Sequence, residues 1–239
     1  MSGYFIAGTD TGIGKTRVTA GLITTFRNRG LDAVGMKPVA CGLINDNGHF
    51  FSEDVDIICR SSGQDPALPE VNPYSFREPI SPNIAARIHR KSIDLSEIGR
   101  YFSLIAAKGK FPFIEGAGGW YTPISEDQTM ADIARLMKLP VILVVGLRLG
   151  CLNQALLSAR AIRADGLPLA GWIGNRIDED FAEPEANIET LTMRLGSAPL
   201  AVLPYSHSLR SALPALGEAA DQLLAGSVHR PQEAPNPLT

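Results

Sequence analysis

The sequence predicts an α/β fold in which helices cover both faces of a mostly parallel sheet. Short apolar runs rich in β-branched residues alternate along the chain with longer stretches of helical periodicity, as in repeated βαβ units. The run at residues 141–145 is apolar at every position, and strands of that kind lie in parallel sheets between two helical layers. Ligands of such sheets bind beyond the carboxyl ends of the strands. Functional residues should therefore follow the strands directly.

Six strands and three helices can be placed from these patterns. A helix over residues 16–29 would bring Val18, Leu22 and Phe26 to one face. Another helix begins at Asp94, where Glu97 has the spacing of a capping box. The strands, most of them ended by Gly or Pro, are expected at residues 4–7, 33–36, 111–114, 141–145, 169–173 and 200–203. The third helix, over residues 152–163, would align Leu152, Leu156, Ala159 and Arg163 on one face.

The composition is that of a globular protein with a sizeable core. The chain has 239 residues, of which 45% are apolar and 20% are charged. No Ser/Gly-rich linker, charge block or internal repeat divides it, so a single domain over residues 1–225 is expected. Residues 226–239 contain three prolines and little that could pack, which predicts a disordered tail.

Charge and targeting signals argue against several classes of partner. The net charge is −3 and the basic residues are scattered, so no stripe would neutralise a nucleic acid. A signal peptide is not recognisable, and the longest apolar run, at residues 140–147, is too short to cross a bilayer. Cys41, Cys59 and Cys151 form no C-x-x-C pair, which favours small buried thiols over disulfides or zinc. A cytoplasmic protein without a membrane or nucleic-acid partner is expected.

The first expected strand leads into GTDTGIGKT at residues 8–16 and then into a helix. This is the context of a P-loop, whose backbone N–H groups wrap a phosphate at a helix N-terminus. Lys15 would reach the β- and γ-phosphates, and the Thr16 hydroxyl would bind Mg²⁺. Thr9 stands where the ordinary pattern has its first glycine, so the loop is one residue longer. The sequence thus predicts a nucleoside triphosphate site in a P-loop NTPase-like fold.

A carboxylate ends the strand FPFIE and is followed by glycines, which is the layout of a Walker-B element. Glu115 could hold Mg²⁺ directly or through water, although a surface Glu at a strand end is the alternative. Asp54 lies at the start of an expected helix, where acids often serve only the helix dipole. Lys37 ends another strand on the same rim and could meet developing negative charge, but a solvated lysine fits the spacing equally well.

Five segments together resemble the ATP-dependent dethiobiotin synthetases. They are GTDT-x-x-GKT at residues 8–16, KPVA-x-G at 37–42, VNPY at 71–74, EGAGGW at 115–120 and LGCLN at 149–153. The matching segments extend from the N-terminus to about Tyr205. The lysine and glutamate segments are far more specific than a P-loop alone.

The resemblance implies an ATP- and Mg²⁺-dependent ligase of biotin biosynthesis that acts on 7,8-diaminononanoate and CO₂. In that family a carbamate forms on one amine, ATP phosphorylates it, and the second amine displaces phosphate to close the ureido ring. The resemblance also implies a homodimer, in which the loop at residues 150–153 reaches the substrate of the partner subunit. By itself, that loop predicts only an anion site at a helix start or a simple cap by Asn153 or a neighbour.

The site residues implied by the resemblance fall into four groups. Catalysis would involve Lys37, Lys15 and Thr11, and the metal ligands would be Thr16, Asp54 and Glu115. The substrate would contact Lys37, Cys41, Gly150, Cys151 and Asn153. ATP would contact Gly12, Ile13, Gly14, Lys15, Thr16, Arg17, Asp54, Glu115, Gly116, Ala117, Gly118, Asn175, Arg176, Pro204, Tyr205 and Ser206.

Two positions depart from the family pattern, and three further interpretations remain open. Cys41 replaces the more usual Ser or Thr, and a thiol is a weaker hydrogen-bonding group. Gly12 replaces an acid found in some relatives. The segment from Asn175 to Asp178 superficially matches a guanine-reading pattern, although the resemblance favours adenine. The rival functions are a related P-loop amidoligase and an ATP-switched partitioning or assembly protein. The latter usually has an extra lysine early in the loop, which is absent here.

Overall fold

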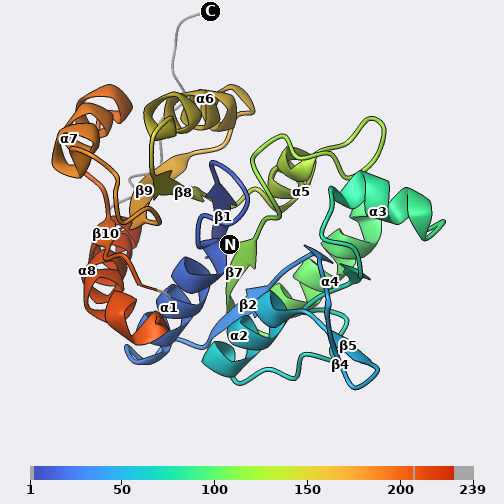
Figure 1. Ribbon diagram of the computed structural model, residues 1–239. Coiled ribbons are helices and arrows are strands. Elements are labelled where there is room, and N and C mark those ends of the chain that lie inside the picture. Colours follow the sequence, from blue (N-terminus) through green and yellow to red (C-terminus); the bar gives the residue numbers. More distant parts are fainter. Residues whose placement is uncertain (1–2, 207, 229–239) are drawn as a thin grey trace, which may run out of the picture.

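A six-stranded, all-parallel sheet forms the centre of the protein (Figure 1). The structure, a computed structural model, describes residues 3–206 and 208–228. The strand order is β10-β9-β8-β1-β7-β2, so the first strand lies in the interior of the sheet. All six expected strands are present and the predicted fold class is confirmed. Their bounds are β1 (Tyr4–Gly8), β2 (Ala33–Met36), β7 (Phe111–Glu115), β8 (Val141–Leu147), β9 (Leu169–Arg176) and β10 (Ala201–Leu203).

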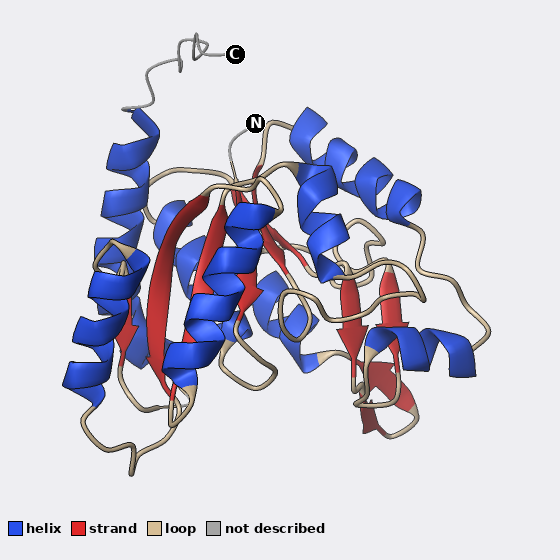
Figure 2. Cartoon of the chain, turned by 90° about the horizontal axis from the view of Figure 1, so that it is seen from above, coloured by secondary structure: helices blue, strands red, loops and turns tan. Residues whose placement is uncertain are grey.

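Helices cover both faces of this sheet, as Figures 1 and 2 show. One layer contains α1 (Lys15–Arg27), α2 (Glu53–Ser62) and α8 (Leu209–Val228). The other contains α4 (Leu95–Ala107), α5 (Met130–Met137), α6 (Cys151–Ala164) and α7 (Pro184–Leu195). The expected face of α1 is confirmed, because Val18, Leu22 and Phe26 are all fully buried.

The two layers explain why the strands are apolar at consecutive positions. In β1, Phe5 belongs to the core beneath one layer and Ile6 to the core beneath the other. In β8, Leu143 and Val144 are divided in the same way. Successive strand side chains point to opposite faces, so a strand covered on both sides needs no polar positions.

Two small sheets, unforeseen in the sequence, lie beside the main one (Figure 2). Strands β3 (Val39–Cys41) and β6 (Tyr74–Phe76) pair in parallel, and the short helix α3 (Pro82–Ile88) packs against them. Strands β4 (Ile44–Asp46) and β5 (His49–Phe51) form a hairpin. Its turn residues Asn47 and Gly48 both have positive φ angles, as a two-residue hairpin turn requires.

The face of α6 differs from the expected one. Its buried residues are Cys151, Ala155, Ala159 and Ile162. Of the expected stripe only Ala159 is buried, while Leu152 and Leu156 are partly covered and Arg163 is exposed. The helix turns three small side chains and Ile162 toward the core, and the small ones permit close approach, whereas Leu152 and Leu156 lie at the edge.

The start of α4 also differs from a simple capping box. Asp94 caps the helix by accepting a hydrogen bond from the Ser96 N–H (2.8 Å). Glu97 does not bond the Asp94 N–H directly, because the Tyr74 hydroxyl stands between them. That hydroxyl accepts from the Asp94 N–H (3.0 Å) and donates to the Glu97 carboxylate (2.5 Å). The capping role expected of Glu97 is therefore relayed through a tyrosine of β6.

The C-terminal helix α8, which was not predicted, extends into the segment expected to be a disordered tail. Because α8 continues to Val228, residues 226–228 of the expected tail are helical, and residues 229–239 lie outside the described part. The single domain over residues 1–225 stays a prediction. Within residues 3–206 and 208–228, no helix is both long and apolar enough to cross a membrane.

Candidate active site

Three adjacent strands bring the main candidate residues to one edge of the sheet. The P-loop follows β1, Glu115 ends β7, and Lys37 follows β2. Because Glu115 pairs in register with Ile6, it lies one strand away from the start of the loop. The cavity at this edge has a volume of about 790 Å³. Its lining includes Thr11, Gly12, Gly14, Lys15, Thr16, Lys37, Cys41, Asp54, Glu115, Ala117 and Gly118.

The P-loop turns into α1 at Gly14, whose φ of 85° is left-handed. A Cβ at this position would lie 2.2 Å from the Asn175 Nδ2 atom, so both the backbone and the packing require glycine. The buried Lys15 ammonium donates to the carbonyls of Asp10 (2.7 Å) and Gly118 (2.8 Å). Burial lowers its pKa to about 8, although Glu115 opposes the shift. The lysine thus lies over the loop, with its ammonium held by neutral carbonyl groups.

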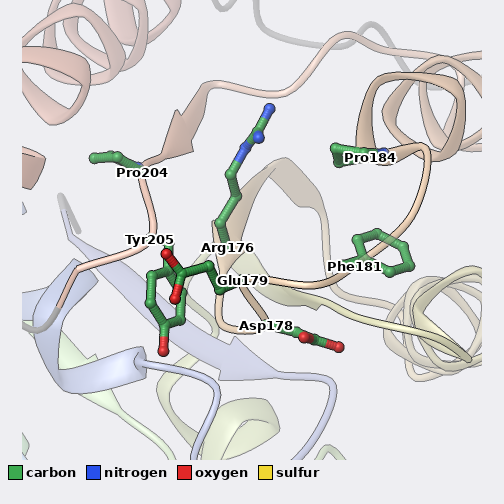
Figure 3. Close-up of a pocket in the computed structure, with 7 residues that line it drawn as sticks. All are labelled: Arg176, Asp178, Glu179, Phe181, Pro184, Pro204 and Tyr205. Carbon is green, nitrogen blue, oxygen red and sulfur yellow. The ribbon is translucent and has the colours of Figure 1, made fainter.

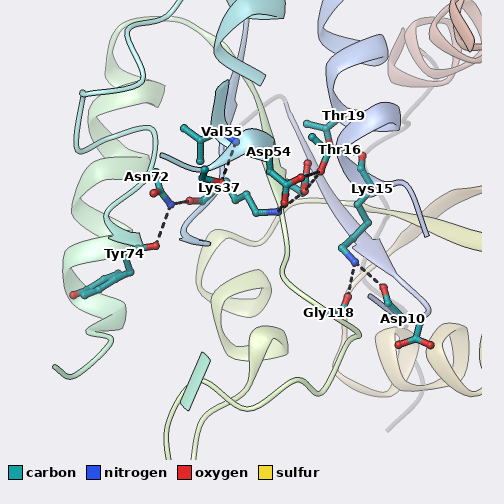
Figure 4. A network of polar contacts seen from close by, with 12 residues as sticks. Asp10, Lys15, Thr16, Thr19, Lys37, Asp54, Val55, Asn72, Tyr74 and Gly118 are labelled. Atoms are coloured by element: carbon teal, nitrogen blue, oxygen red, sulfur yellow. Dashed lines mark hydrogen bonds and ion pairs between the residues drawn. The ribbon is translucent and has the colours of Figure 1, made fainter. Parts of the chain in front are cut away.

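A compact ionic cluster lies next to the P-loop (Figure 4). The Lys37 Nζ atom is 2.7 Å from Asp54 Oδ2 and 2.5 Å from Glu115 Oε1. The Thr16 hydroxyl oxygen is 2.8 Å from one oxygen of each carboxylate, and its single proton can serve either. The structure therefore brings Thr16, Lys37, Asp54 and Glu115 together from four separate elements.

The charges in this cluster stabilise one another despite burial. Desolvation alone would lower the pKa of the Lys37 ammonium, but Glu115 and Asp54 outweigh it and the pKa is raised. Burial alone would raise the pKa of the Asp54 carboxyl, but Lys37 and Thr16 hold it below its usual value. Lys37 is 4% exposed, so it is not the solvated lysine that the sequence left open. Asp54 likewise does more than face the dipole of α2.

The oxygen atoms of the cluster fit Mg²⁺. The Glu115 Oε2 atom is buried and has no hydrogen-bond partner among the described residues, although such atoms are normally satisfied. Mg²⁺ prefers oxygen ligands and is commonly held by one or two carboxylates together with substrate phosphates. Among the described residues no group of three or more His, Cys, Asp and Glu side chains is placed to bind a metal. The two carboxylates and the Thr16 hydroxyl are the candidate donor set.

Two supporting residues were not identified from the sequence. Asn72 donates to the carbonyls of Lys37 (2.6 Å) and Tyr74 (3.1 Å), which fixes the backbone on which Lys37 is mounted. Thr122 accepts a hydrogen bond from the Gly119 N–H (2.8 Å) and so shapes the glycine loop after β7. Asn72 belongs to the VNPY segment, which served only for the family resemblance. A polar residue between two apolar neighbours could have suggested a structural role for Asn72.

The wall opposite the P-loop contains Cys41 and several apolar residues. Cys41 is partly buried, and burial raises its thiol pKa to about 11, so the thiol stays protonated at neutral pH. Seven lining residues were missed by sequence reasoning because no motif marks them: Glu53, Pro79, Ile80, Ser81, Pro82, Thr122 and Pro123. Of the other cysteines, Cys59 and Cys151 are the small buried hydrophobes that were expected.

A second cavity, of about 320 Å³, lies beside the residues expected at the base (Figure 3). Arg176, Pro204 and Tyr205 line it, whereas Asn175 is buried behind and Ser206 is not in the lining. The remaining lining residues are Asp178, Glu179, Phe181 and Pro184. Arg176 forms an ion pair with Glu185 on α7. The structure thus gathers most of the residues expected around the base, from the ends of β9 and β10.

The start of α6 does not join the main cavity within this chain. Gly150 has a left-handed φ of 94°, and no side chain caps the helix, contrary to the simple cap that the sequence left open. Cys151 is fully buried in the core, and its backbone N–H already donates to the Arg148 carbonyl (3.0 Å). Asn153 is exposed and Leu149 is 91% exposed. Arg148 ties this loop to the P-loop through an ion pair with Asp10 (2.5 Å).

Comparisons with known proteins agree with this arrangement. Residues 2–212 match the family model described as "AAA domain". The chain is 43% identical over 202 residues to the ATP-dependent dethiobiotin synthetase BioD of Aromatoleum aromaticum, covering 84% of this chain and 90% of the relative. It is 39% identical over 214 residues to the protein of the same name from Xanthomonas oryzae, covering 90% and 96%.

Solved structures with similar folds are distant in sequence. The MinD cell division protein of Aquifex aeolicus superimposes with a TM-score of 0.58 at 14% identity, covering 94% of this chain and 98% of that one. The cell division ATPase MinD of Pyrococcus furiosus gives 0.56 at 16%, covering 94% and 99%. At these identities the likeness establishes the fold alone. Together with the close relatives, it shows that the chain belongs to the ATP-dependent dethiobiotin synthetase family, within the P-loop NTPase fold.

Proposed function

We propose that the protein catalyses ATP-dependent closure of the dethiobiotin ureido ring from 7,8-diaminononanoate and CO₂, in biotin biosynthesis. Family membership supports the reaction. The observation that carries it in this chain is the buried Lys37 ammonium, held between two carboxylates beside a P-loop. A nucleotide switch needs the P-loop and its metal carboxylates but has no need of a buried cation facing a second substrate.

The reaction has three balanced steps. An amine of the substrate attacks CO₂ and loses a proton, which gives a carbamate. A carbamate oxygen then attacks the γ-phosphorus of ATP and ADP leaves. The second amine attacks the carbonyl carbon and loses a proton, and inorganic phosphate leaves with the oxygen that had joined it to that carbon. Phosphorylation turns a poor leaving group into a good one, so the protein contributes mainly position and charge.

Lys15 and Lys37 would stabilise negative charge on different groups during this reaction. The free N–H groups at the start of α1 would bind the phosphates together with Lys15, whose ammonium would leave the Asp10 and Gly118 carbonyls to do so. Lys37 would release the carboxylates and turn to the carbamate and the transferring phosphoryl group, where negative charge grows. Thr11, exposed at the mouth of the same cavity, is proposed to help position these groups.

Thr16, Asp54 and Glu115 would hold Mg²⁺, which supplies charge neutralisation on the phosphates when it is bound. The Lys37 ammonium contacts one oxygen atom of each of these carboxylates in this structure, Asp54 Oδ2 and Glu115 Oε1. Binding of a metal to these carboxylates and departure of the Lys37 ammonium from them would therefore favour each other. The glycine loop of Gly116, Ala117 and Gly118 would lie along the phosphates, next to the Lys15 ammonium.

The nucleotide base is proposed to bind at the 320 Å³ cavity, with Asn175, Arg176, Pro204, Tyr205 and Ser206 around it. On the P-loop side, Gly12, Ile13 and Gly14 would contact the phosphates through their backbone, and Arg17 extends from the first turn of α1 toward the base side. Comparison with the family favours adenine as the base.

We further propose a homodimer with shared active sites. The backbone N–H groups of Leu152 and Asn153, in the first turn of α6, would bind the substrate carboxylate of the partner subunit, with the Asn153 side chain beside it. Two features support this: the helix start lacks a side-chain cap, and the neighbouring Leu149 and Leu157 are 91% and 60% exposed. The cytoplasm is the proposed location, in agreement with three free cysteines in the described chain.

Phosphate release tests the proposed reaction directly. With Mg-ATP and bicarbonate, release should be slow until 7,8-diaminononanoate is added, and dethiobiotin should appear in equal amount. Hydrolysis that ignores the diamine, or that responds to a protein partner instead, would favour a nucleotide switch.

A further inference from the structure

Arg17 joins three segments around the proposed base site. Its Nη1 atom donates to the Asn175 side-chain oxygen (3.1 Å) and to the Pro204 carbonyl (3.1 Å). Its Nη2 atom donates to the Ser211 hydroxyl oxygen (3.0 Å). One guanidinium at the first turn of α1 thereby connects the end of β9, the loop after β10 and the start of α8. The family resemblance placed Arg17 among the residues that contact ATP, but nothing in the sequence indicated these contacts within the chain.

These contacts fix the orientation of the Asn175 amide. A guanidinium can only donate, so the Asn175 atom facing Arg17 must be the oxygen. On the opposite side, Nδ2 donates to the Ile13 carbonyl (2.8 Å), which can only accept. Both neighbours therefore demand the same orientation, and a flipped amide would place two acceptors together and two donors together.

Packing further restricts the Asn175 side chain. It is 3% exposed and lies so close to Gly14 that any Cβ there would overlap its Nδ2 atom. Within the described part of the chain, each amide atom has one hydrogen bond, which leaves one N–H and one oxygen lone pair. The side chain can thus offer a ligand one donor and one acceptor, in a fixed order.

That fixed order suits adenine and not guanine. Adenine presents a donor at N6 beside an acceptor at N7, which pairs with an amide oxygen and an amide N–H. Guanine presents acceptors at both O6 and N7, so one of them would face the amide oxygen. A second contact of Arg17 acts at the same place, because Pro204, whose carbonyl it holds, lines the 320 Å³ cavity (Figure 3).

We propose that Arg17 is a positioning residue that locks the Asn175 amide in one orientation and so makes the site select adenine over guanine nucleotides. This inference rests on the proposed placement of the base next to Asn175. It does not require the base to touch Arg17.

Nucleotide binding in the absence of the diamine tests the inference separately from the proposed reaction. ADP and GDP affinities would be measured by calorimetry for the wild type, Arg17→Lys, Asn175→Ala and the double variant. Arg17→Lys keeps the charge but loses the fork that reaches three partners. The wild type should prefer ADP, and Arg17→Lys should reduce that preference on the order of tenfold, mainly by weakening ADP.

The double variant separates positioning from general support. If Arg17 acts through Asn175, then Arg17→Lys should change the ADP to GDP ratio little once Asn175 is already alanine. Ser211→Ala is the matched control, because it removes one Arg17 contact while leaving the bond to Asn175. Ser211→Ala should keep the wild-type ratio of ADP to GDP affinity. Its melting temperature measures how much the hydrogen bond between Arg17 and Ser211 contributes to stability.

Two results would overturn the inference. An equal loss of ADP and GDP affinity in Arg17→Lys would mean that Arg17 supports only the fold or the general charge of the site. A wild type that prefers GDP would mean that Asp178 reads the base and Asn175 does not. If Arg17→Lys does not fold, Arg17→Gln is used instead. Its side chain is shorter and uncharged but still carries an N–H donor, and it must still lose more affinity for ADP than for GDP. None of these outcomes depends on whether the diamine is the substrate.

Discussion

The phosphate end of the site and the start of α6 both follow strands of one sheet, but they differ in how many of their contacts this chain supplies. At the phosphate end, Thr16, Lys37, Asp54 and Glu115 already contact one another. The start of α6 has an uncapped helix end, an exposed Asn153 and a Leu149 side chain that is 91% exposed. This difference motivates the proposal that phosphoryl chemistry is organised within one chain, whereas recognition of the substrate carboxylate would be completed by the partner subunit.

The largest expected effect concerns the self-contained end. Lys37→Ala should leave nucleotide binding largely intact, because Lys15 serves the ground-state phosphates, and should lower kcat on the order of 100-fold or more. That loss corresponds to roughly 3 kcal/mol, as for removal of one preorganised donor at developing charge. Steady-state kinetics and ADP titration measure the two effects. An unchanged kcat would remove Lys37 from the chemistry.

A pH effect should appear at the same end. Since the Lys15 pKa is lowered to about 8 in the free protein, the side chain becomes neutral above that pH, whereas bound phosphates favour the ammonium. ATP binding should therefore take up a proton there, and affinity should fall by up to about tenfold per pH unit above pH 8. Below that pH the lysine is charged in both states and the slope disappears. Lys15→Arg, which stays protonated, should lack the slope, and a wild type without it contradicts the account.

The metal site should respond to loss of its internal cation. In Lys37→Met, Asp54 and Glu115 lose their ammonium partner, so Mn²⁺ should bind more tightly than to the wild type when nucleotide is absent. The expected gain is on the order of tenfold, or ~1.4 kcal/mol. Electron paramagnetic resonance of free Mn²⁺ measures it without turnover. Lys37→Arg is the control that keeps the charge, and weaker binding in Lys37→Met would show that the lysine does not compete with the metal.

The smallest effect is expected at the wall of the main cavity. Cys41→Ser replaces a weak hydrogen-bonding thiol with a hydroxyl, and one ordinary hydrogen bond contributes about 0.5–1.5 kcal/mol. The KM for the diamine should fall a few-fold while kcat stays unchanged. Cys41→Ala, which can make no such bond, should not show the gain. A KM that is equal in the two variants would place Cys41 out of contact with the substrate.

Local patterns predicted the main sheet well, because uninterrupted apolar runs have few alternatives in a buried parallel sheet. The three-residue strands β3 to β6 escaped notice because they are too short to show periodicity. The face of α6 was misjudged because alanine and cysteine carry a weak apolar signal, although their size lets the helix approach the core. In each case a tertiary contact decided the outcome.

The site shows the same division. Motif spacing predicted that Lys15, Thr16 and Glu115 would meet, since their strands end at one edge. The support that Asn72 gives to Lys37 and the lock that Arg17 places on Asn175 join residues 35 and 158 positions apart. No local pattern encodes such contacts. The proposed role of residues 150–153 would depend on a second chain, so neither the sequence nor a single protomer could display it.

Complementation between two inactive variants tests the shared site most directly. Asn153→Glu should repel the substrate carboxylate, and Lys37→Ala should disable the chemistry, so each homodimer would be nearly inactive. When equal amounts exchange subunits at random, about half of the dimers are mixed. In a shared arrangement each mixed dimer gathers both lesions into one site and leaves the other intact, which restores about one quarter of the wild-type activity. Mixing Lys37→Ala with Lys15→Ala is the matched control, since both lesions lie at the phosphate end and no intact site can form. Recovery in the first mixture alone is the result the account predicts. Proven subunit exchange between folded variants with no recovery would contradict it and would place the carboxylate site within a single chain.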